Sequence, residues 1–133
     1  ADRTMHANSP DTAKQIRSLT RGHGAHHVFE AVGAAPSIDT ALACVRKGGS
    51  VTLVGNLSPT VPMPLQAIVT RELTLLGSCA SAGEYPACLE LMARGKIDVQ
   101  SLLSAVAPLE QGPQWFARLY DHEPGLMKVV LSP

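Results

Sequence analysis

The stretch KGGSVTLVGN, Lys47 to Asn56, reads as a short buried strand with glycines on both sides. Its centre is mostly apolar or β-branched, which is typical of a strand covered on both faces. Gly55 stands at the exit of this strand. Glycine offers no side chain to pack, so in this place it marks a turn or a close approach of backbone or ligand. The stretch therefore raises a question of function as well as of fold.

Strand and helix patterns alternate along the rest of the chain. The patterns predict strands at 27–32, 50–55, 73–79, 102–107 and 128–131. They predict helices at 10–20, 36–47, 65–70, 85–94 and 113–120. Such alternation predicts right-handed βαβ units, that is, an α/β fold whose parallel sheet carries helices on its faces.

Three glycines occupy equivalent places in this scheme. Gly33, Gly55 and Gly77 fall at or near the carboxyl ends of consecutive predicted strands, which is the edge where parallel sheets bind ligands. Each glycine alone could simply permit a tight turn. Their recurrence favours an open shelf of bare backbone on which a flat ligand could lie, with polar groups such as Ser78 nearby.

Charge and composition exclude several classes of partner. Eleven basic side chains balance eleven acidic ones, so nothing favours nucleic acid or an anionic membrane. No apolar run approaches the roughly 20 residues of a membrane-spanning helix. Cys44, Cys79 and Cys88 lack C-x-x-C spacing, which predicts reduced, buried thiols in a cytoplasmic protein. The chain begins with ADRTMH, and we expect it to be part of a longer protein.

Five segments carry a resemblance to a known family: HVFEAVG, ALACVRKGGSVTLVGN, RELTLLGS, LELMARGKID and MKVVLSP. In this order and spacing they are similar to the C-terminal half of the medium-chain dehydrogenase/reductases, above all the zinc-containing alcohol and polyol dehydrogenases. The resemblance implies the C-terminal half of a Rossmann-type doubly wound parallel sheet. It assigns residues 1–80 to a partial dinucleotide-binding (Rossmann) domain, and residues 81–133 to the last Rossmann helix and a segment returning to the catalytic domain.

The resemblance also implies a nicotinamide coenzyme, NAD or NADP, for the parent protein. The loop after the first clear strand would line the coenzyme cleft, and the loop after the second would pass beside the nicotinamide-ribose. The third would place backbone near the carboxamide, and a lysine would reach the phosphates. The implied coenzyme-binding residues are Ala31, Val32, Gly33, Val54, Gly55, Asn56, Ser78, Ala80 and Lys128.

Other parts of such an enzyme fall outside this sequence. The G-x-G-x-x-G phosphate turn is absent, and GHGAHH precedes a strand where that turn would follow one. The resemblance places the catalytic zinc in the intact parent, with ligands outside this chain, so we assign no catalytic residue and no metal ligand here. By itself the chain is expected to show little or no dehydrogenase activity.

The partners follow from the same resemblance. They are a small alcohol or carbonyl substrate and a second copy of the chain, which would join through the edge strand Leu73 to Ser78. Two alternatives stay open. One is a zinc-free quinone or enoyl reductase of the same superfamily, and the other is a non-catalytic Rossmann-like binding or dimerisation module.

Several other side chains invite functional interpretations that we reject. His23, His26 and His27 lack the Cys or carboxylate partners of a metal site. Glu30 lies inside an apolar strand, which favours a buried carboxylate with a polar partner over a general base. Four further side chains are predicted to be structural: Ser37 as a helix cap, and Trp115, Phe116 and Tyr120 as core of the last helix.

Overall fold

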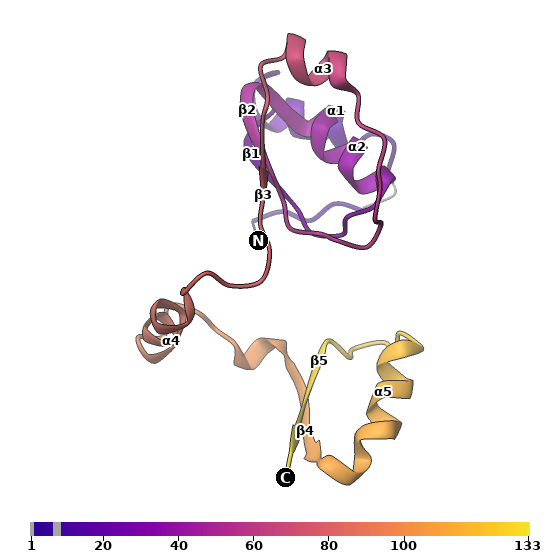
Figure 1. Ribbon diagram of the computed structural model, residues 1–133, viewed down its shortest axis with the longest axis vertical. Coiled ribbons are helices and arrows are strands. Elements are labelled where there is room, and N and C mark those ends of the chain that lie inside the picture. The colour runs from indigo at the N-terminus through magenta and orange to yellow at the C-terminus, as the bar shows by residue number, and fades with distance from the viewer. Residues whose placement is uncertain (1, 7–8) are drawn as a thin grey trace. The chain divides into compact units, whose positions relative to one another are not determined.

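The computed structural model describes residues 2–6 and 9–133. Within them the chain forms two compact units, Ala1–Ala80 and Ser81–Pro133, each with its own helices and strands (Figure 1). None of the helices in these ranges has the length and apolar character needed to cross a membrane.

The first unit is built on a three-stranded parallel sheet with the order β1-β2-β3. Its elements are α1 (Thr12–Leu19), β1 (Ala25–Glu30), α2 (Ala35–Cys44), β2 (Val45–Leu53), α3 (Leu65–Thr70) and β3 (Thr74–Gly77). A helix follows each of the first two strands, so the predicted α/β fold with a parallel sheet is confirmed. Figure 1 shows α1 and α2 on the same side of the sheet.

The core of this unit lies between α2 and one face of the sheet. Val28, Val51 and Leu75 are register partners across the three strands, and Val51 is completely buried. Ile38, Ala41 and Leu42 of α2 pack against that face, as the helical spacing of these residues predicts. The opposite face carries Phe29, whose side chain remains 74% exposed. One helix stripe thus covers one sheet face.

The boundary between α2 and β2 differs from the prediction. The helix ends at Cys44, and Val45 already has extended backbone angles. Val45 pairs with Ala25, and the pairing then shifts register before it resumes between His27 and Ser50. Tertiary pairing with β1 therefore ends a helix that the apolar spacing alone would extend to Lys47.

Two arginines satisfy carbonyl groups at the carboxyl end of α2. The guanidinium of Arg71 donates to the Leu42 carbonyl at 2.7 Å and also to the Val45 carbonyl. Arg17 donates to the Ala43 carbonyl at 3.0 Å. Both cations also complement the negative end of the helix dipole.

We expect Arg71→Gln to lower the free energy of unfolding by about 2 kcal/mol, the loss typical of charge-assisted hydrogen bonds to a partly buried partner. Urea unfolding followed by circular dichroism would measure it. The matched control is Lys47→Gln, which removes an exposed ion pair with Glu72 and should cost less than about 0.5 kcal/mol. Equal losses in the two variants would contradict the capping role.

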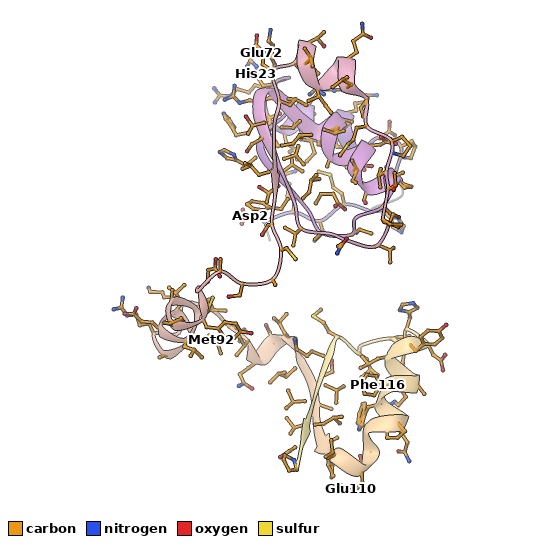
Figure 2. The ribbon with its side chains drawn as sticks, viewed as in Figure 1. Asp2, His23, Glu72, Met92, Glu110 and Phe116 are labelled. Carbon is orange, nitrogen blue, oxygen red and sulfur yellow. The ribbon has the colours of Figure 1, made fainter. Side chains whose placement is uncertain are left out.

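The second unit contains a pair of parallel strands and two α-helices. Its elements are α4 (Tyr85–Ala93), η1 (Gln100–Leu102), β4 (Leu103–Pro108), η2 (Leu109–Gln111), α5 (Gly112–Tyr120) and β5 (Lys128–Ser132). The buried centre is small: Ala107 is buried, and Gly112 lies close to Leu131. Apolar side chains of α4 such as Leu89 and Met92 are exposed, and Figure 2 labels Met92 on that helix.

The prediction of an aromatic core on α5 is wrong for two of the three residues. Phe116 and Tyr120 are 71% and 84% exposed. Trp115 is half-buried, and the guanidinium of Arg118 lies over its ring, 4.1 Å from the centroid. Arg118 also forms an ion pair with Glu123 at 2.6 Å. The helix spacing is as predicted, but the two-stranded sheet offers too little surface to cover the whole aromatic face.

Candidate functional site

Two loops at the carboxyl edge of the sheet are bonded to each other. Loop 1 is residues 31–34, after β1, and loop 2 is residues 54–58, after β2. The Val54 and Gly55 amides donate to the Glu30 carbonyl at 2.8 and 3.0 Å. The Leu57 amide donates to the Val32 carbonyl at 3.2 Å, and the Ser58 amide donates to the Gly33 carbonyl at 2.9 Å. The pairing of β1 and β2 thus continues beyond both strands.

Gly33 and Gly55 lie where these loops touch. A Cβ atom on Gly55 would stand 2.0 Å from the Gly33 nitrogen, and one on Gly33 would stand 2.3 Å from the Asn56 nitrogen. Gly33 also has a φ of +79°, which favours glycine. The prediction of an open shelf of bare backbone is therefore wrong at Gly33 and Gly55. These glycines admit neighbouring backbone, whereas Gly77 faces open space with nothing within 4 Å.

The third strand adds an open edge beside loop 2. Gly77 is the register partner of Leu53, and the Ser78 amide donates to the Leu53 carbonyl at 3.0 Å. A hollow of about 490 Å³ lies between the two segments, and we call it the β2–β3 hollow. It is lined by Leu53, Val54, Gly55, Asn56, Gly77, Ser78, Cys79 and Ala80. Its size falls within the range of small-molecule sites.

A second and larger cavity is lined in part by loop 1. This β1–α2 cavity has a volume of about 800 Å³ and is mostly apolar. Its walls include Met5 and His6 of the N-terminal segment, Ala31 and Val32 of loop 1, and Thr40 of α2. The sequence reasoning missed it, because the segment around Met5 carries no helix, strand or motif signal that would place it against β1.

The predicted coenzyme residues therefore divide into groups. Ala31 and Val32 line the β1–α2 cavity, and Gly33 is buried between the two loops. Lys128 is exposed at the start of β5 in the second unit. The other five predicted residues all line the β2–β3 hollow: Val54, Gly55, Asn56, Ser78 and Ala80.

The buried Glu30 carboxylate binds the backbone amides of loop 1. Its side chain is 3% exposed. One carboxylate oxygen accepts the Val32 amide at 2.8 Å, and both oxygens accept the Gly33 amide at 3.0 Å. Burial by itself would raise the pKa of Glu30, but hydrogen bonding from the Gly33 amide, Ser37 and the Val32 amide outweighs it and lowers the pKa. The predicted polar pairing of this buried carboxylate is confirmed, and backbone amides provide it.

This pKa has a consequence for acid stability. A carboxyl group whose pKa is lower in the folded than in the unfolded protein stabilises the fold above its unfolded pKa of about 4.3, and that stability is lost as the pH falls through the folded pKa. We expect the wild-type melting temperature to fall more steeply between about pH 5 and pH 3 than that of Glu30→Gln. Thermal melts at several pH values would test this, and parallel curves would contradict it.

The other side chains considered from the sequence form no metal site. Among residues 2–6 and 9–133, no group of three or more His, Cys, Asp and Glu side chains could hold a metal ion. His27 is hydrogen-bonded through its Nδ1 to the Ser50 hydroxyl at 2.7 Å. The Ser37 hydroxyl accepts the Ala34 amide at 3.4 Å and donates to the Ala34 carbonyl at 2.8 Å, so it caps the start of α2 from the third helical position, with Ala34 at the N-cap. Only Cys44 is buried, so the prediction of buried thiols is wrong for Cys79 and Cys88.

Comparison with known proteins gives the same family throughout. Residues 1–94 match the family model described as zinc-binding dehydrogenase. Sorbitol dehydrogenase from Bacillus subtilis is 27% identical over 134 residues, covering 100% of this chain and 38% of that protein. The structure of alcohol dehydrogenase TADH from Thermus sp. ATN1 aligns with a TM-score of 0.84 at 31% identity, over 97% of this chain and 38% of that one.

A further solved structure, an NAD-dependent alcohol dehydrogenase, aligns with a TM-score of 0.80 at 26% identity, over 100% of this chain and 38% of that one. The chain thus spans a little over a third of the length of these relatives. Its parallel strands correspond to the Rossmann-type domain of that family. With 94 of its residues matched by the family model, the chain belongs to the zinc-binding dehydrogenases of the medium-chain dehydrogenase/reductase type.

Proposed function

We propose that this chain forms the nicotinamide side of the coenzyme cleft in a zinc-type, NAD(P)-dependent alcohol or polyol dehydrogenase. The observation that carries the proposal is the β2–β3 hollow at the carboxyl edge of a parallel sheet, beside two loops that are bonded together. This edge is where sheets of this kind bind nucleotides. The family of the chain supports the same assignment.

The residues of the hollow suit a planar, polar ring. Gly77 leaves its backbone bare, and loop 2 presents exposed Val54 and Asn56 side chains to the same space. We assign Val54, Gly55 and Asn56 to one wall, and Ser78 and Ala80 to the other. The bound nicotinamide would supply the hydride acceptor, and the part of this chain is to hold the ring and keep water from it.

The remaining predicted residues have other roles in the proposal. Ala31 and Val32 would bound the part of the cleft formed by the β1–α2 cavity. Gly33 would act only as a spacer that lets loop 2 approach, because it is buried. Lys128 is proposed to reach the coenzyme phosphates in the whole protein.

The catalytic zinc of the family does not fit the residues described here, since no set of three ligands occurs among them. We therefore derive no step through a metal from this chain. Its ligands are proposed to lie in the rest of the protein. The substrate class, a small alcohol or polyol and its carbonyl product, is proposed from the names of the relatives, sorbitol dehydrogenase and alcohol dehydrogenase.

We also propose that two copies join through β3 and that the protein works in the cytoplasm. β3 is an edge strand of the sheet, and its Leu76 is 50% exposed, so pairing would cover both unpaired backbone and apolar surface. The three cysteines are free thiols, which fits a reducing compartment. Analytical ultracentrifugation of Leu76→Lys should show loss of the dimer, whereas Phe29→Lys on the opposite edge strand should leave it intact.

Titration of the whole gene product with NADH and NADPH by fluorescence and calorimetry tests the coenzyme assignment. We expect saturable binding of at least one coenzyme, and oxidation of alcohols or polyols that stops when zinc is chelated. Turnover without zinc would favour a quinone or enoyl reductase, and absence of binding would favour a non-catalytic module. The 133-residue chain alone should show little or no turnover, because the phosphate-binding turn is outside it.

A further inference from the structure

Glu30 lies outside the two loops of the proposed cleft and forms hydrogen bonds to both of them. Its side chain accepts the Val32 and Gly33 amides of loop 1. Its backbone carbonyl accepts the Val54 and Gly55 amides of loop 2. A buried carboxylate with three such contacts is held in a single orientation.

Loop 2 in turn depends on where loop 1 lies. The Leu57 and Ser58 amides donate to the Val32 and Gly33 carbonyls. These are carbonyls of the same two residues whose amides bind the Glu30 carboxylate. A Cβ atom on either Gly33 or Gly55 would clash with the backbone of the other loop, so the two loops are packed against each other at these glycines. Displacement of loop 1 must therefore change the position of Asn56 at the wall of the β2–β3 hollow.

The contacts of the β2–β3 hollow do not by themselves explain why position 30 carries an acidic residue. Glu30 is absent from the wall of the β2–β3 hollow and contributes to the wall of the β1–α2 cavity. A glutamine could fill the same space, but it has one acceptor oxygen where the carboxylate has two, and its NH2 group is a donor that cannot accept the loop 1 amides. The carboxylate is therefore suited to fixing the loops.

We propose that Glu30 is a positioning residue for the coenzyme cleft: its carboxylate fixes loop 1, and loop 1 fixes loop 2 beside the β2–β3 hollow. The inference rests on the proposed function for the identity of the ligand. The coupling between the two loops rests on the hydrogen bonds alone.

The first test measures the loops directly in this chain. In Glu30→Gln, hydrogen exchange of the Leu57 and Ser58 amides should become about tenfold faster, the effect of losing one charge-assisted hydrogen bond in the supporting loop. The matched control is Arg71→Gln, which weakens the same unit at the carboxyl end of α2. In Arg71→Gln, exchange of the Leu57 and Ser58 amides should accelerate by no more than exchange of the core amide of Val51 does.

Glu30→Asp provides the rescue. An aspartate keeps the charge, and its shorter side chain readily accepts amides two and three residues further along the chain. We expect exchange of the Leu57 and Ser58 amides to return to within about threefold of the wild type. If Glu30→Gln leaves these amides protected, or accelerates all amides of the unit equally, Glu30 is only a stabilising residue and the inference fails.

The second test measures coenzyme affinity in the whole gene product. Glu30→Gln should weaken coenzyme binding about tenfold, while Arg71→Gln at a similar loss of melting temperature should change it less than about twofold. Unchanged affinity in Glu30→Gln overturns the inference while leaving the proposed function intact. Absence of coenzyme binding in the wild type overturns the proposed function, and with it the coenzyme role of Glu30.

Discussion

Gly55→Ala should lower the free energy of unfolding of the first unit by about 4 kcal/mol or more, in the range reserved for severe steric or core defects. The added methyl group would lie 2.0 Å from the Gly33 nitrogen and about as close to the Val32 backbone. These atoms are backbone atoms, so no side chain can rotate away to make room. Loop 2 would have to separate from loop 1 and break the hydrogen bonds of Val54 and Gly55.

Two other glycines of the same unit provide controls. Gly77→Ala adds a methyl group where nothing lies within 4 Å, and we expect a change below about 1 kcal/mol. Gly48→Ala also meets open space but has a φ of +67°, so it should cost about 1 to 2 kcal/mol from backbone strain alone. Urea unfolding by circular dichroism would rank the three variants. A melting temperature for Gly55→Ala close to that of Gly77→Ala would disprove the close contact.

Leu42→Ala should lower the free energy of unfolding by about 3 kcal/mol, the usual cost of a cavity at a buried leucine. Leu42 is 5% exposed and packs with Val45 and Val51 in the core between α2 and the sheet. The surrounding residues come from both a helix and strands, so they have little freedom to collapse into the space.

The control for this variant removes a larger side chain from the other face of the same sheet. Phe29 is 74% exposed, so Phe29→Ala should cost less than about 1 kcal/mol in this chain. Thermal or urea unfolding of both variants would measure the contrast. A loss from Phe29→Ala as large as that from Leu42→Ala would show that the outer face is covered in solution.

Much of the fold could be predicted because local pattern and tertiary packing agree. The helix Leu65–Thr70 occupies the predicted residues, and the strand Lys128–Ser132 ends one residue beyond them. In α2 the spacing of Ile38, Ala41 and Leu42 already identified the buried face. The sequence prediction was wrong where long-range contacts decide the secondary structure or the burial of a residue. Val45 is a strand residue because Ala25 lies beside it, and Phe116 is exposed because no apolar surface of its unit reaches it.

The candidate site shows the same division. The alternation of strands and helices determined a parallel sheet, and the glycines at the strand exits predicted a ligand-binding edge at residues 33, 55 and 77. Both features depend on periodicity and backbone freedom, which neighbouring residues carry. The tertiary structure alone decided that Gly33 and Gly55 pack against each other while Gly77 stays open. The tertiary structure also showed that the Glu30 carboxylate accepts the amides of loop 1. Gly33 and Gly55 are 22 residues apart in the chain, so their contact is set by packing. Glu30 is only three residues from Gly33, but a strand pattern does not state which groups a buried carboxylate will meet.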